Sequence, residues 1–468
     1  METIEKDRVL HTHLAQGVPL INATNLDYAE TGTGVSIAVC DTGTDYTHPM
    51  LGGGGIPNGK VIGGYDFGDD DTDPMDEVGH GTCCAGIAAG DIGTTGDYVG
   101  GVAYNAKLYA LKITPGTENW GYTSDMVASW EWCITHQQDD PDNPILVIST
   151  SMGSGRYLST CDGVSTALSE AAANAVAAGI TLFVSSGNDG YCDALSWPAC
   201  LSDVISVGAV YDSGLGTFYP CVSADSCVTK YATADCESGY YATDSTAADI
   251  VPSYSNAASL LDLLAPSDRT YTTDISGPGG YAHGDYYSAF GGTSASAPYA
   301  AGAAACLQGA AKAATGSYLT PSEVRSYLAD TGSLTTDEKA SVVKPRINLN
   351  GAINSALTTP LCKCLMTPTS DTVSQGGRLG FDVSVTNNTG KAGIVKFGTK
   401  LERLDGSLSG FIWGPLSIWL NPNQTKSGSK QHTVPTNFQL GTYTYHGYVG
   451  NYGQIFDECQ FQFEVVSP

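Results

Sequence analysis

The chain has 468 residues, of which 42% are hydrophobic and 15% are charged, so it is long enough to bury a large core. Its 21 basic and 48 acidic residues give a net charge of −27, which argues against nucleic acid as a partner because phosphate binding needs a basic surface. The mean hydropathy is −0.07, and no window approaches the roughly 18–20 apolar residues of a membrane span, so no membrane partner is expected.

Four apolar runs in the first half of the chain predict strands that are buried on both faces. Each run is continuous in Val, Ile and Leu, which is typical of a parallel sheet. The runs occupy residues 34–40, 106–113, 144–152 and 180–187. Stretches with helical spacing follow His80 and occupy 124–137 and 163–179. This alternation predicts an α/β fold with a doubly wound, mostly parallel sheet.

The segment of about 211–255 is rich in Ser, Thr, Asp, Tyr and Cys, and we interpret it as a surface excursion from the α/β domain. The 14 cysteines are many for a cytosolic enzyme and predict a secreted protein in an oxidising, extracellular location. No apolar signal segment opens the sequence, so we expect a mature chain with an added initiator Met. Six cysteines are predicted to form disulfides whose pairing the sequence leaves open: Cys161, Cys192, Cys200, Cys221, Cys227 and Cys236.

Two further helices are predicted before the character of the sequence changes near residue 358. An Ala-rich run from 299 to about 314 predicts the first, and a capping box at Thr320–Glu323 predicts the start of the second. We therefore interpret residues 1–357 as one α/β domain and residues 358–365 as a linker.

Residues 366–468 predict a second, smaller domain, an all-β sandwich. Strand-like segments separated by Gly and Asn turns occupy residues 379–385, 441–449 and 458–466. Cys459 lies on the apolar face of the last of these segments. A disulfide from Cys362 or Cys364 to Cys459 would join the first and last strands of the sandwich.

Three positions combine a carboxylate, an imidazole and a hydroxyl in the chain order Asp, His, Ser, one of the orders that build a catalytic triad. Asp41 follows a predicted parallel strand, and catalytic groups of α/β sheets gather at that end. His80 begins a predicted helix. Ser294 leads into another, where the helix dipole favours negative charge on the serine oxygen and on an adjacent oxyanion.

The residues around these positions resemble the three signatures of the subtilisin-like serine proteases. The matching motifs are Asp41-Thr42-Gly43, His80-Gly81-Thr82-x-x-Ala85-Gly86 and Gly292-Thr293-Ser294-x-Ser296-x-Pro298. The resemblance covers about residues 20–357 and implies a subtilisin-like catalytic domain, here of a secreted type with a C-terminal β-sandwich. It implies hydrolysis of peptide bonds through an acyl-enzyme, in which Ser294 is the nucleophile, His80 the general base and then acid, and Asp41 the residue that orients the imidazole.

The resemblance also implies an oxyanion hole and a substrate site. Asn188 is similar to the family's oxyanion donor and would act with the backbone N–H of Ser294. The implied substrate-binding residues are Ser151, Met152, Gly153, Gly187 and Ser196. Because no acidic residue is evident at these positions, we expect broad specificity with a preference for apolar side chains before the scissile bond. Trp120 and Tyr122 are either an aromatic subsite or ordinary surface aromatics.

No cofactor is expected for the chemistry, but the resemblance implies structural Ca²⁺. Asp91 and Asp97 bracket a loop that is similar in position to a calcium loop of the family, although the family's ligand pattern is not reproduced. The acidic run from Asp69 to Glu77 matches no EF-hand spacing. It is a Ca²⁺ site, a site for cationic substrate side chains or a solvated turn.

Cys84 lies one helical turn after His80. It is either a reactive thiol beneath the imidazole or a small buried core residue.

The leading hypothesis is a secreted, monomeric serine endopeptidase that acts on proteins or peptides. We expect its propeptide either to be supplied outside this sequence or not to be needed for folding. Two alternatives stay open. One is a transpeptidase or macrocyclase that uses the same triad, and the other is a catalytically silent binding protein with an adhesive C-terminal domain. The intact Asp41, His80, Asn188 and Ser294 argue against the second alternative.

Overall fold

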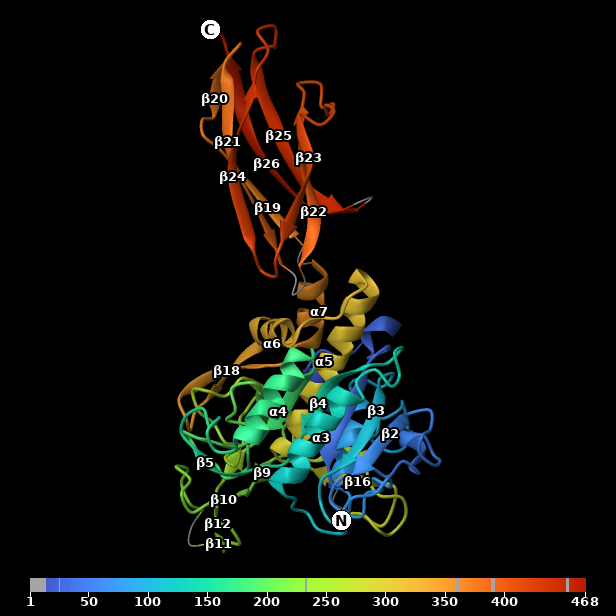
Figure 1. Cartoon of the computed structure of the whole chain (residues 1–468). Coiled ribbons are helices and arrows are strands. Elements are labelled where there is room, and N and C mark those ends of the chain that lie inside the picture. Colours follow the sequence, from blue (N-terminus) through green and yellow to red (C-terminus); the bar gives the residue numbers. More distant parts are fainter. Residues whose placement is uncertain (1–13, 25, 232–233, 359–361, 389–391, 452–453) are drawn as a thin grey trace, which may run out of the picture. The chain divides into compact units, whose positions relative to one another are not determined.

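The structure, a computed structural model, describes residues 14–24, 26–231, 234–358, 362–388, 392–451 and 454–468 (Figure 1). The chain divides into two units, with the boundary between Ala356 and Leu357. Among the described residues, no helix is both long enough and apolar enough to cross a membrane.

A nine-stranded sheet forms the centre of the first unit, and it confirms the predicted α/β architecture. Its strands run parallel, except that the edge strand β17 runs antiparallel to its neighbour β18, which is itself parallel to β14. In sheet order the strands are β17 (Ser333–Asp337), β18 (Val342–Arg346), β14 (Leu263–Ser267), β8 (Ile205–Tyr211), β6 (Thr181–Ser185), β4 (Ile145–Thr150), β1 (Ser36–Asp41), β3 (Lys107–Lys112) and β2 (Val61–Asp66). The neighbouring strands β1, β4 and β6 lead directly into the residues of the candidate site.

Helices cover both faces of this sheet, which is why its central strands are continuously apolar. In β1, Ile37 and Val39 belong to the core that includes α2 and α5, whereas Ala38 and Cys40 belong to the core that includes α3 and α4. The helices are α1 (Leu14–Leu20), α2 (His80–Ala89), α3 (Thr123–Thr135), α4 (Thr166–Ala177), α5 (Thr293–Thr315), α6 (Pro321–Asp330) and α7 (Leu349–Thr358), with short 3₁₀ helices at Tyr28–Glu30 and Pro49–Leu51.

Helix α5 begins at Thr293, so the predicted start at residue 299 was too late. The prediction stopped at Pro298 because proline usually interrupts a helix. Here Pro298 lies within the helix near its start, and the carbonyl that it leaves without an intrahelical donor, that of Ser294, has other partners.

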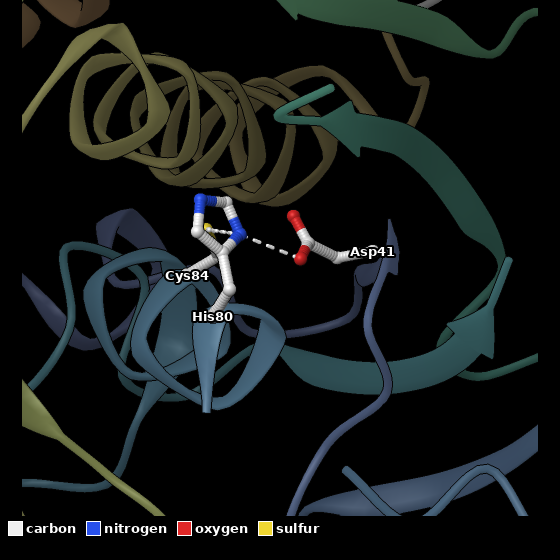
Figure 2. Close-up of side chains that lie close together, drawn as sticks. All are labelled: Asp41, His80 and Cys84. Carbon is white, nitrogen blue, oxygen red and sulfur yellow. Dashed lines mark hydrogen bonds and ion pairs between the residues drawn. The ribbon is translucent and has the colours of Figure 1, made fainter. Parts of the chain in front are cut away.

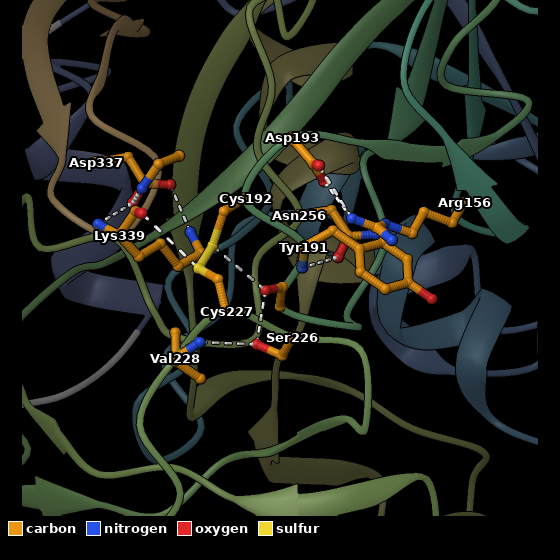
Figure 3. The surroundings of a disulfide bond; sticks show 12 residues. Arg156, Tyr191, Cys192, Asp193, Ser226, Cys227, Val228, Asn256, Asp337 and Lys339 are labelled. Atoms are coloured by element: carbon orange, nitrogen blue, oxygen red, sulfur yellow. Dashed lines mark hydrogen bonds and ion pairs between the residues drawn. A yellow bond between two sulfur atoms is a disulfide. The ribbon is translucent and has the colours of Figure 1, made fainter.

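The excursion folds into small strands that disulfides connect to the rest of the unit. All six cysteines predicted to be paired form disulfides: Cys161–Cys200, Cys192–Cys227 and Cys221–Cys236. Figure 3 shows how Cys192–Cys227 joins the excursion to the loop that follows β6. The remaining short strands of the unit are β5 (Ser154–Tyr157), β7 (Leu195–Trp197), β9 (Thr217–Phe218), β10 (Cys221–Ser223), β11 (Asp235–Cys236), β12 (Gly239–Tyr241), β13 (Asp244–Ser245), β15 (Thr270–Thr273) and β16 (Tyr286–Phe290).

The second unit is the predicted β-sandwich. Its sheets have the orders β19-β21-β24 and β20-β26-β25-β22-β23, and their facing side chains form one hydrophobic core. The strands are β19 (Cys362–Pro368), β20 (Thr372–Ser374), β21 (Arg378–Asn387), β22 (Gly393–Glu402), β23 (Trp413–Leu420), β24 (Thr425–Thr433), β25 (Gly441–Asn451) and β26 (Gln454–Val466).

Strand β19 begins at Cys362, so the predicted linker of 358–365 extends too far. Cys362 and Cys364 alternate with exposed residues and face the sandwich core, which is the pattern of a strand with one buried face. Cys364 forms the disulfide with Cys459, and Cys362 is a buried free thiol.

Candidate active site

Asp41 and His80 form a hydrogen-bonded pair at the carboxyl edge of the sheet (Figure 2). Asp41 is the last residue of β1, and its Oδ1 lies 2.7 Å from Nδ1 of His80. The same oxygen accepts the backbone N–H of Thr42 at 2.8 Å. The side chain of Asp41 is 1% exposed and that of His80 is 20% exposed. Because a carboxylate oxygen only accepts, Nδ1 carries the proton, and Nε2 is left to act as the base.

The first turn of α2, which carries His80, is held by the buried carboxylate of Asp76. Its Oδ1 accepts the hydroxyl of Thr42 and two backbone N–H groups just before the helix, all at 2.9 Å. Its Oδ2 accepts the backbone N–H and the hydroxyl of Thr82 at 2.8 and 2.6 Å. Asp76 therefore connects the loop after Asp41 to the turn that carries His80. We noted this residue in the sequence only as part of an acidic run.

Ser294 lies in the first turn of α5, where backbone N–H groups lack acceptors inside the helix. The carbonyl of Ser294 would normally accept from the residue four positions later, but this is Pro298, which has no N–H. That carbonyl instead accepts the hydroxyl of Ser151 at 3.1 Å and the thiol of Cys84 at 3.5 Å. Pro298 thus allows the segment after β4 and helix α2 to contact the backbone of the candidate nucleophile.

The hydroxyl of Ser294 points to Ser151 in the described structure. Its Oγ donates to the Ser151 carbonyl oxygen at 3.4 Å, a long hydrogen bond, and not to His80. Both Ser294 and His80 line one cleft. Catalytic hydrogen bonds often tighten only when substrate binds. The Asp–His half of the predicted triad is therefore formed, and the His–Ser half requires a rotation of the serine side chain.

The side-chain amide of Asn188 is oriented by Thr293. Its Oδ1 accepts the backbone N–H of Thr293 at 2.8 Å and the hydroxyl of Thr293 at 3.0 Å. These two donors identify the oxygen, so Nδ2 is the end of the amide that is free to donate. Asn188 lines the same cleft as Ser294. The arrangement offers an N–H donor from each residue to a developing oxyanion.

The electrostatic environment makes His80 a stronger base than an ordinary histidine. Burial lowers the pKa of His80, but the Asp41 carboxylate acts in the opposite direction, and the net result is a pKa well above the ordinary 6.5. A strengthened base suits the removal of a proton from a serine hydroxyl.

Cys84 is a buried core residue with a protonated thiol. Burial, followed by the charge of Asp41, raises the pKa of this thiol to about 12. Its Sγ lies 3.9 Å from Nδ1 of His80. Among the described residues, Asp41, His80 and Cys84 are the only three His, Cys, Asp or Glu side chains close enough together to share a metal ion. The protonated thiol and the Asp41–His80 hydrogen bond do not fit such a site.

A cleft of about 650 Å³ opens beside these groups. It is lined by every residue that the sequence assigned to substrate binding, namely Ser151, Met152, Gly153, Gly187 and Ser196. Gly187 has φ of +105°, and a Cβ there would lie 2.2 Å from Oγ of Ser196, so only glycine fits this wall of the cleft. Trp120 and Tyr122 also line the cleft, and their rings form an edge-to-face pair with centroids 5.3 Å apart.

Asp189 also lines the cleft, although the sequence analysis did not assign it to substrate binding. Its Oδ2 accepts from Nδ2 of Asn256 at 3.1 Å and from Oγ of Ser196 at 3.3 Å. Arg156 pairs with Asp193 instead, as Figure 3 shows. No ion pair within the described residues neutralises Asp189. The cleft therefore has a carboxylate that is available to a ligand. Its position directly after Asn188 was the signal in the sequence.

Asp91, one of the two residues predicted to hold calcium, pairs with a lysine in the structure. The carboxylate of Asp91 pairs with Nζ of Lys60 at 2.8 Å, and the Lys60 side chain is 4% exposed. A buried ammonium beside Asp91 would repel a cation. Asp91 and Asp97 also belong to no group of three His, Cys, Asp or Glu ligands among the described residues.

The acidic run before His80 surrounds a lysine. Nζ of Lys112 lies 2.9 Å from Asp66, 3.5 Å from Asp69 and 3.1 Å from Glu77. The run is therefore partly an internal ion-pair network, and Asp76 within it has the structural role described above.

Comparison with known proteins agrees with this geometry. The sequence profile of the subtilase family, peptidase S8, matches residues 32–352. Serine protease AprX of Bacillus subtilis is 31% identical over 334 residues, which are 70% of this chain and 67% of that protein. Subtilisin E of the same species is 31% identical over 313 residues, which are 65% of this chain and 64% of that protein. The matches thus span about two thirds of these relatives.

A solved structure is also similar to this chain. The crystal structure of a cold adapted subtilisin-like serine proteinase covers 68% of this chain and 89% of its own, with a TM-score of 0.47 and 24% sequence identity.

Proposed function

Because the chain belongs to the subtilase family, we propose that it is a serine endopeptidase that hydrolyses proteins or peptides through an acyl-enzyme on Ser294. The observation that carries this proposal is the buried Asp41–His80 hydrogen bond of 2.7 Å, which lies beside the cleft that Ser294 and Asn188 line. These four residues supply the nucleophile, the base, the orienting acid and the oxyanion donor of peptide hydrolysis.

Acylation starts with rotation of the Ser294 side chain toward Nε2 of His80. The ring accepts the hydroxyl proton as Oγ attacks the scissile carbonyl carbon, and Asp41 stabilises the resulting imidazolium. The carbonyl oxygen becomes an oxyanion, which accepts from Nδ2 of Asn188 and from the backbone N–H of Ser294. His80 then donates its proton to the leaving amine, and the C–N bond breaks to leave an ester on Ser294.

Deacylation repeats these steps with water. His80 takes a proton from the water molecule as its oxygen attacks the ester carbon, and the same two donors stabilise the second oxyanion. The imidazolium returns its proton to Oγ of Ser294 as the ester bond breaks. The carboxylic acid product leaves, and the resting hydroxyl is restored.

Substrate selection in the cleft combines apolar and acidic groups. Met152 and the backbones of Gly153 and Gly187 suit an apolar side chain before the scissile bond. Asp189 adds a carboxylate that can pair with a substrate ammonium. We therefore extend the expected apolar preference to include lysine. Specificity stays broad because neither feature excludes the other.

The excursion and the second unit are assigned roles around this chemistry. Ser238, from the turn between β11 and β12, lines the cleft, and Cys221–Cys236 holds that turn. We assign the excursion to substrate access. We assign residues 1–357 to catalysis and residues 366–468 to stability or targeting. Tyr443 and Tyr445 of β25 are buried in the sandwich and are therefore not part of a binding surface.

The remaining expectations concern the surroundings of the enzyme. Four disulfides support an extracellular, oxidising location. We propose that the enzyme acts as a monomer with an open cleft.

Labelling with a fluorophosphonate, followed by peptide mapping, tests the proposed function. The expected result is a single adduct on Ser294, which requires an activated serine and an oxyanion hole. The full-length Ser294→Ala variant is the matched control and should take no label. A folded chain that takes no label would favour the catalytically silent binding protein.

The mass of the product tests the transferase alternative. Hydrolysis adds one water to a cleaved peptide, whereas a transpeptidase or macrocyclase returns a product without that mass.

A further inference from the structure

The hairpin formed by β15 and β16 carries an exposed tyrosine beside the candidate base. Residues 274–285 connect the two strands, and Tyr281 lies in this connection. Tyr281 lines the same cleft as His80 and Ser294, and it is 45% exposed. The reaction steps proposed above do not use Tyr281, so its place in the cleft needs a separate explanation.

The ring of Tyr281 lies next to the turn that carries His80. Gly79 has φ of +104°, and a Cβ there would lie 3.4 Å from Cδ2 of Tyr281, which is van der Waals contact. Because glycine has no side chain, nothing from residue 79 separates Tyr281 from the start of α2. The ring centroid of Phe290 lies 5.2 Å from that of His80 and 6.5 Å from that of Tyr281. The base and Tyr281 therefore belong to one continuous group of rings.

The hairpin is attached to the helix that carries the base. The hydroxyl of Thr272 donates to the carbonyl of Cys83 at 3.0 Å. The hydroxyl of Thr273 donates to the carbonyl of Thr82 at 2.7 Å. Both carbonyls belong to α2, whose first residue is His80. The hairpin and the base therefore share one support, and the fold holds the tyrosine at a constant position relative to the reacting atoms.

The buried carboxylate of Asp274 holds the backbone on both sides of Tyr281. Its Oδ1 accepts the N–H of Ile275 and its Oδ2 accepts the N–H of Ala282, both at 2.8 Å. On the other side of the tyrosine, a Cβ on Gly280 would lie 2.1 Å from Oδ1 of Asp274, so a larger residue there would displace the carboxylate. The ring of Tyr281 is therefore placed in the cleft before a substrate binds, which reduces the entropy lost on binding.

The chemistry of acylation indicates which half of a substrate lies beside Tyr281. The acyl half is bonded to Ser294, and its side chain before the scissile bond is assigned to the walls that follow β4 and β6. The other half leaves as an amine, which takes its proton from His80. The amine nitrogen must therefore come within hydrogen-bond reach of Nε2, so the residue after the scissile bond lies on the His80 side of the cleft. Tyr281 lines the cleft on that side.

We propose that Tyr281 contacts the side chain of the residue after the scissile bond and favours aromatic and large apolar residues there. This inference rests on the proposed endopeptidase function. The exposed ring offers apolar area, and aromatic pairs gain further from edge-to-face or offset contacts. Asp274 is fully buried and directs both carboxylate oxygens to backbone N–H groups, so it does not attract a cationic side chain to this place.

Partition of the acyl-enzyme between two amines tests the proposal. In the reverse of acylation, the nitrogen of an added amine attacks the ester carbon on Ser294 and His80 takes its proton; the C–O bond then breaks, and the proton returns to Oγ. The substrate is a peptide methyl ester that ends in leucine, and the amines are phenylalaninamide and alaninamide at equal concentration. Both amines react with the same acyl-enzyme. The ratio of the two amide products, measured by chromatography, therefore reports only on the site for the residue after the scissile bond.

The unmodified enzyme should form more of the phenylalaninamide product, and Tyr281→Ala should lower the ratio of the two products about fivefold. The rate of ester hydrolysis without added amine should not change, because water makes no contact with the ring. The matched control is Tyr219→Ala, which removes a tyrosine that is 46% exposed and does not line the cleft. This control should keep the product ratio of the unmodified enzyme.

A second variant changes the preference instead of removing it. Tyr281→Glu places a carboxylate at the same position, and it should raise the product from argininamide relative to that from alaninamide about fivefold at low ionic strength. Tyr219→Glu, which changes the net charge equally, should not. This variant decides the outcome if Tyr281→Ala does not fold.

The possible failures are distinguishable. An unmodified enzyme that does not cleave the ester would overturn the proposed function, and this inference with it. If the ester is cleaved but the unmodified enzyme forms both amides equally, or if the Tyr281 variants keep its product ratios, only the role of Tyr281 is overturned. An equal loss of hydrolysis and of both amide products in the Tyr281 variants would also overturn it, because the ring would then only support the fold.

Discussion

Replacing Asp189 by Asn tests whether the carboxylate in the cleft selects substrates. The substitution keeps the shape of the side chain and an oxygen that can accept from Asn256 and Ser196, so the wall of the cleft should stay in place. What it removes is the negative charge. The rate for a substrate with lysine before the scissile bond should fall, and the rate for the same peptide with leucine should not change.

The size of this effect follows from the surroundings of the carboxylate. Asp189 is half-buried, with two neutral donors and no ion-pair partner among the described residues. A hydrogen bond to a charged group contributes about 1.5–3 kcal/mol, and partial exposure favours the lower value. About 1.5 kcal/mol corresponds to roughly a tenfold change. The ratio of kcat/KM for lysine over leucine should therefore fall about tenfold in Asp189→Asn.

The assay compares two peptides that differ only at the position before the scissile bond. The matched control is Asp225→Asn, an exposed acid in the excursion that changes the net charge equally and does not line the cleft. If the two variants and the unmodified enzyme share one lysine-to-leucine ratio, Asp189 does not contact the substrate side chain. The lysine-to-leucine ratio is measured at low and at high ionic strength, because salt screens long-range charge effects more than a direct contact. A change in the ratio that disappears at high salt would therefore indicate a long-range effect of the charge.

Three further predictions concern the catalytic groups. Asn188→Ala removes one of the two proposed oxyanion donors and should lower kcat about 10²–10³-fold with little change in KM, measured on a peptide substrate; an unchanged kcat would rule the donor out. Because only neutral His80 accepts a proton and its pKa lies above 6.5, kcat/KM should rise with pH through a value above 6.5. Asp41→Asn should move that rise to lower pH and reduce kcat about 10⁴-fold; a rise at the same pH would show that Asp41 does not set the pKa. Asp76→Ala leaves buried donors before α2 unpaired and should lower the free energy of unfolding by about 3–5 kcal/mol in urea titration, and a loss below about 1 kcal/mol would contradict its role.

The elements of the fold could be predicted because their signals are local. Continuous apolar runs identified β1, β3, β4 and β6, and alternation identified the strands of the sandwich. The errors lie at boundaries. The start of α5 was predicted too late because Pro298 cannot donate a hydrogen bond to the Ser294 carbonyl. In the structure the hydroxyl of Ser151, from a distant part of the chain, donates to that carbonyl instead. Cys362 was placed in a linker because the alternation of β19 is short.

Some residues of the candidate site could likewise be predicted from local sequence, and others could not. Asp41, His80, Asn188 and Ser294 stand in motifs whose spacing is readable along the chain. Asp76 and Asp189 were visible only as members of an acidic run and of a turn. The role of Asp76 depends on its hydrogen bonds with Thr42 and Thr82, and the role of Asp189 depends on its hydrogen bond with Asn256. These partners lie up to 67 residues away in the sequence.

The sequence by itself determined that this protein has an α/β domain with an Asp, His, Ser order and a smaller β domain, and that six particular cysteines are paired. These properties depend on periodicity and on short motifs, which neighbouring residues define. Only the tertiary structure decided which cysteines join, that Lys60 pairs with Asp91, and that β8 lies beside β14. Contacts of this kind depend on which strands become neighbours in the sheet. That order is set by the packing of the whole domain, because hydrophobic burial has no directional preference along the chain.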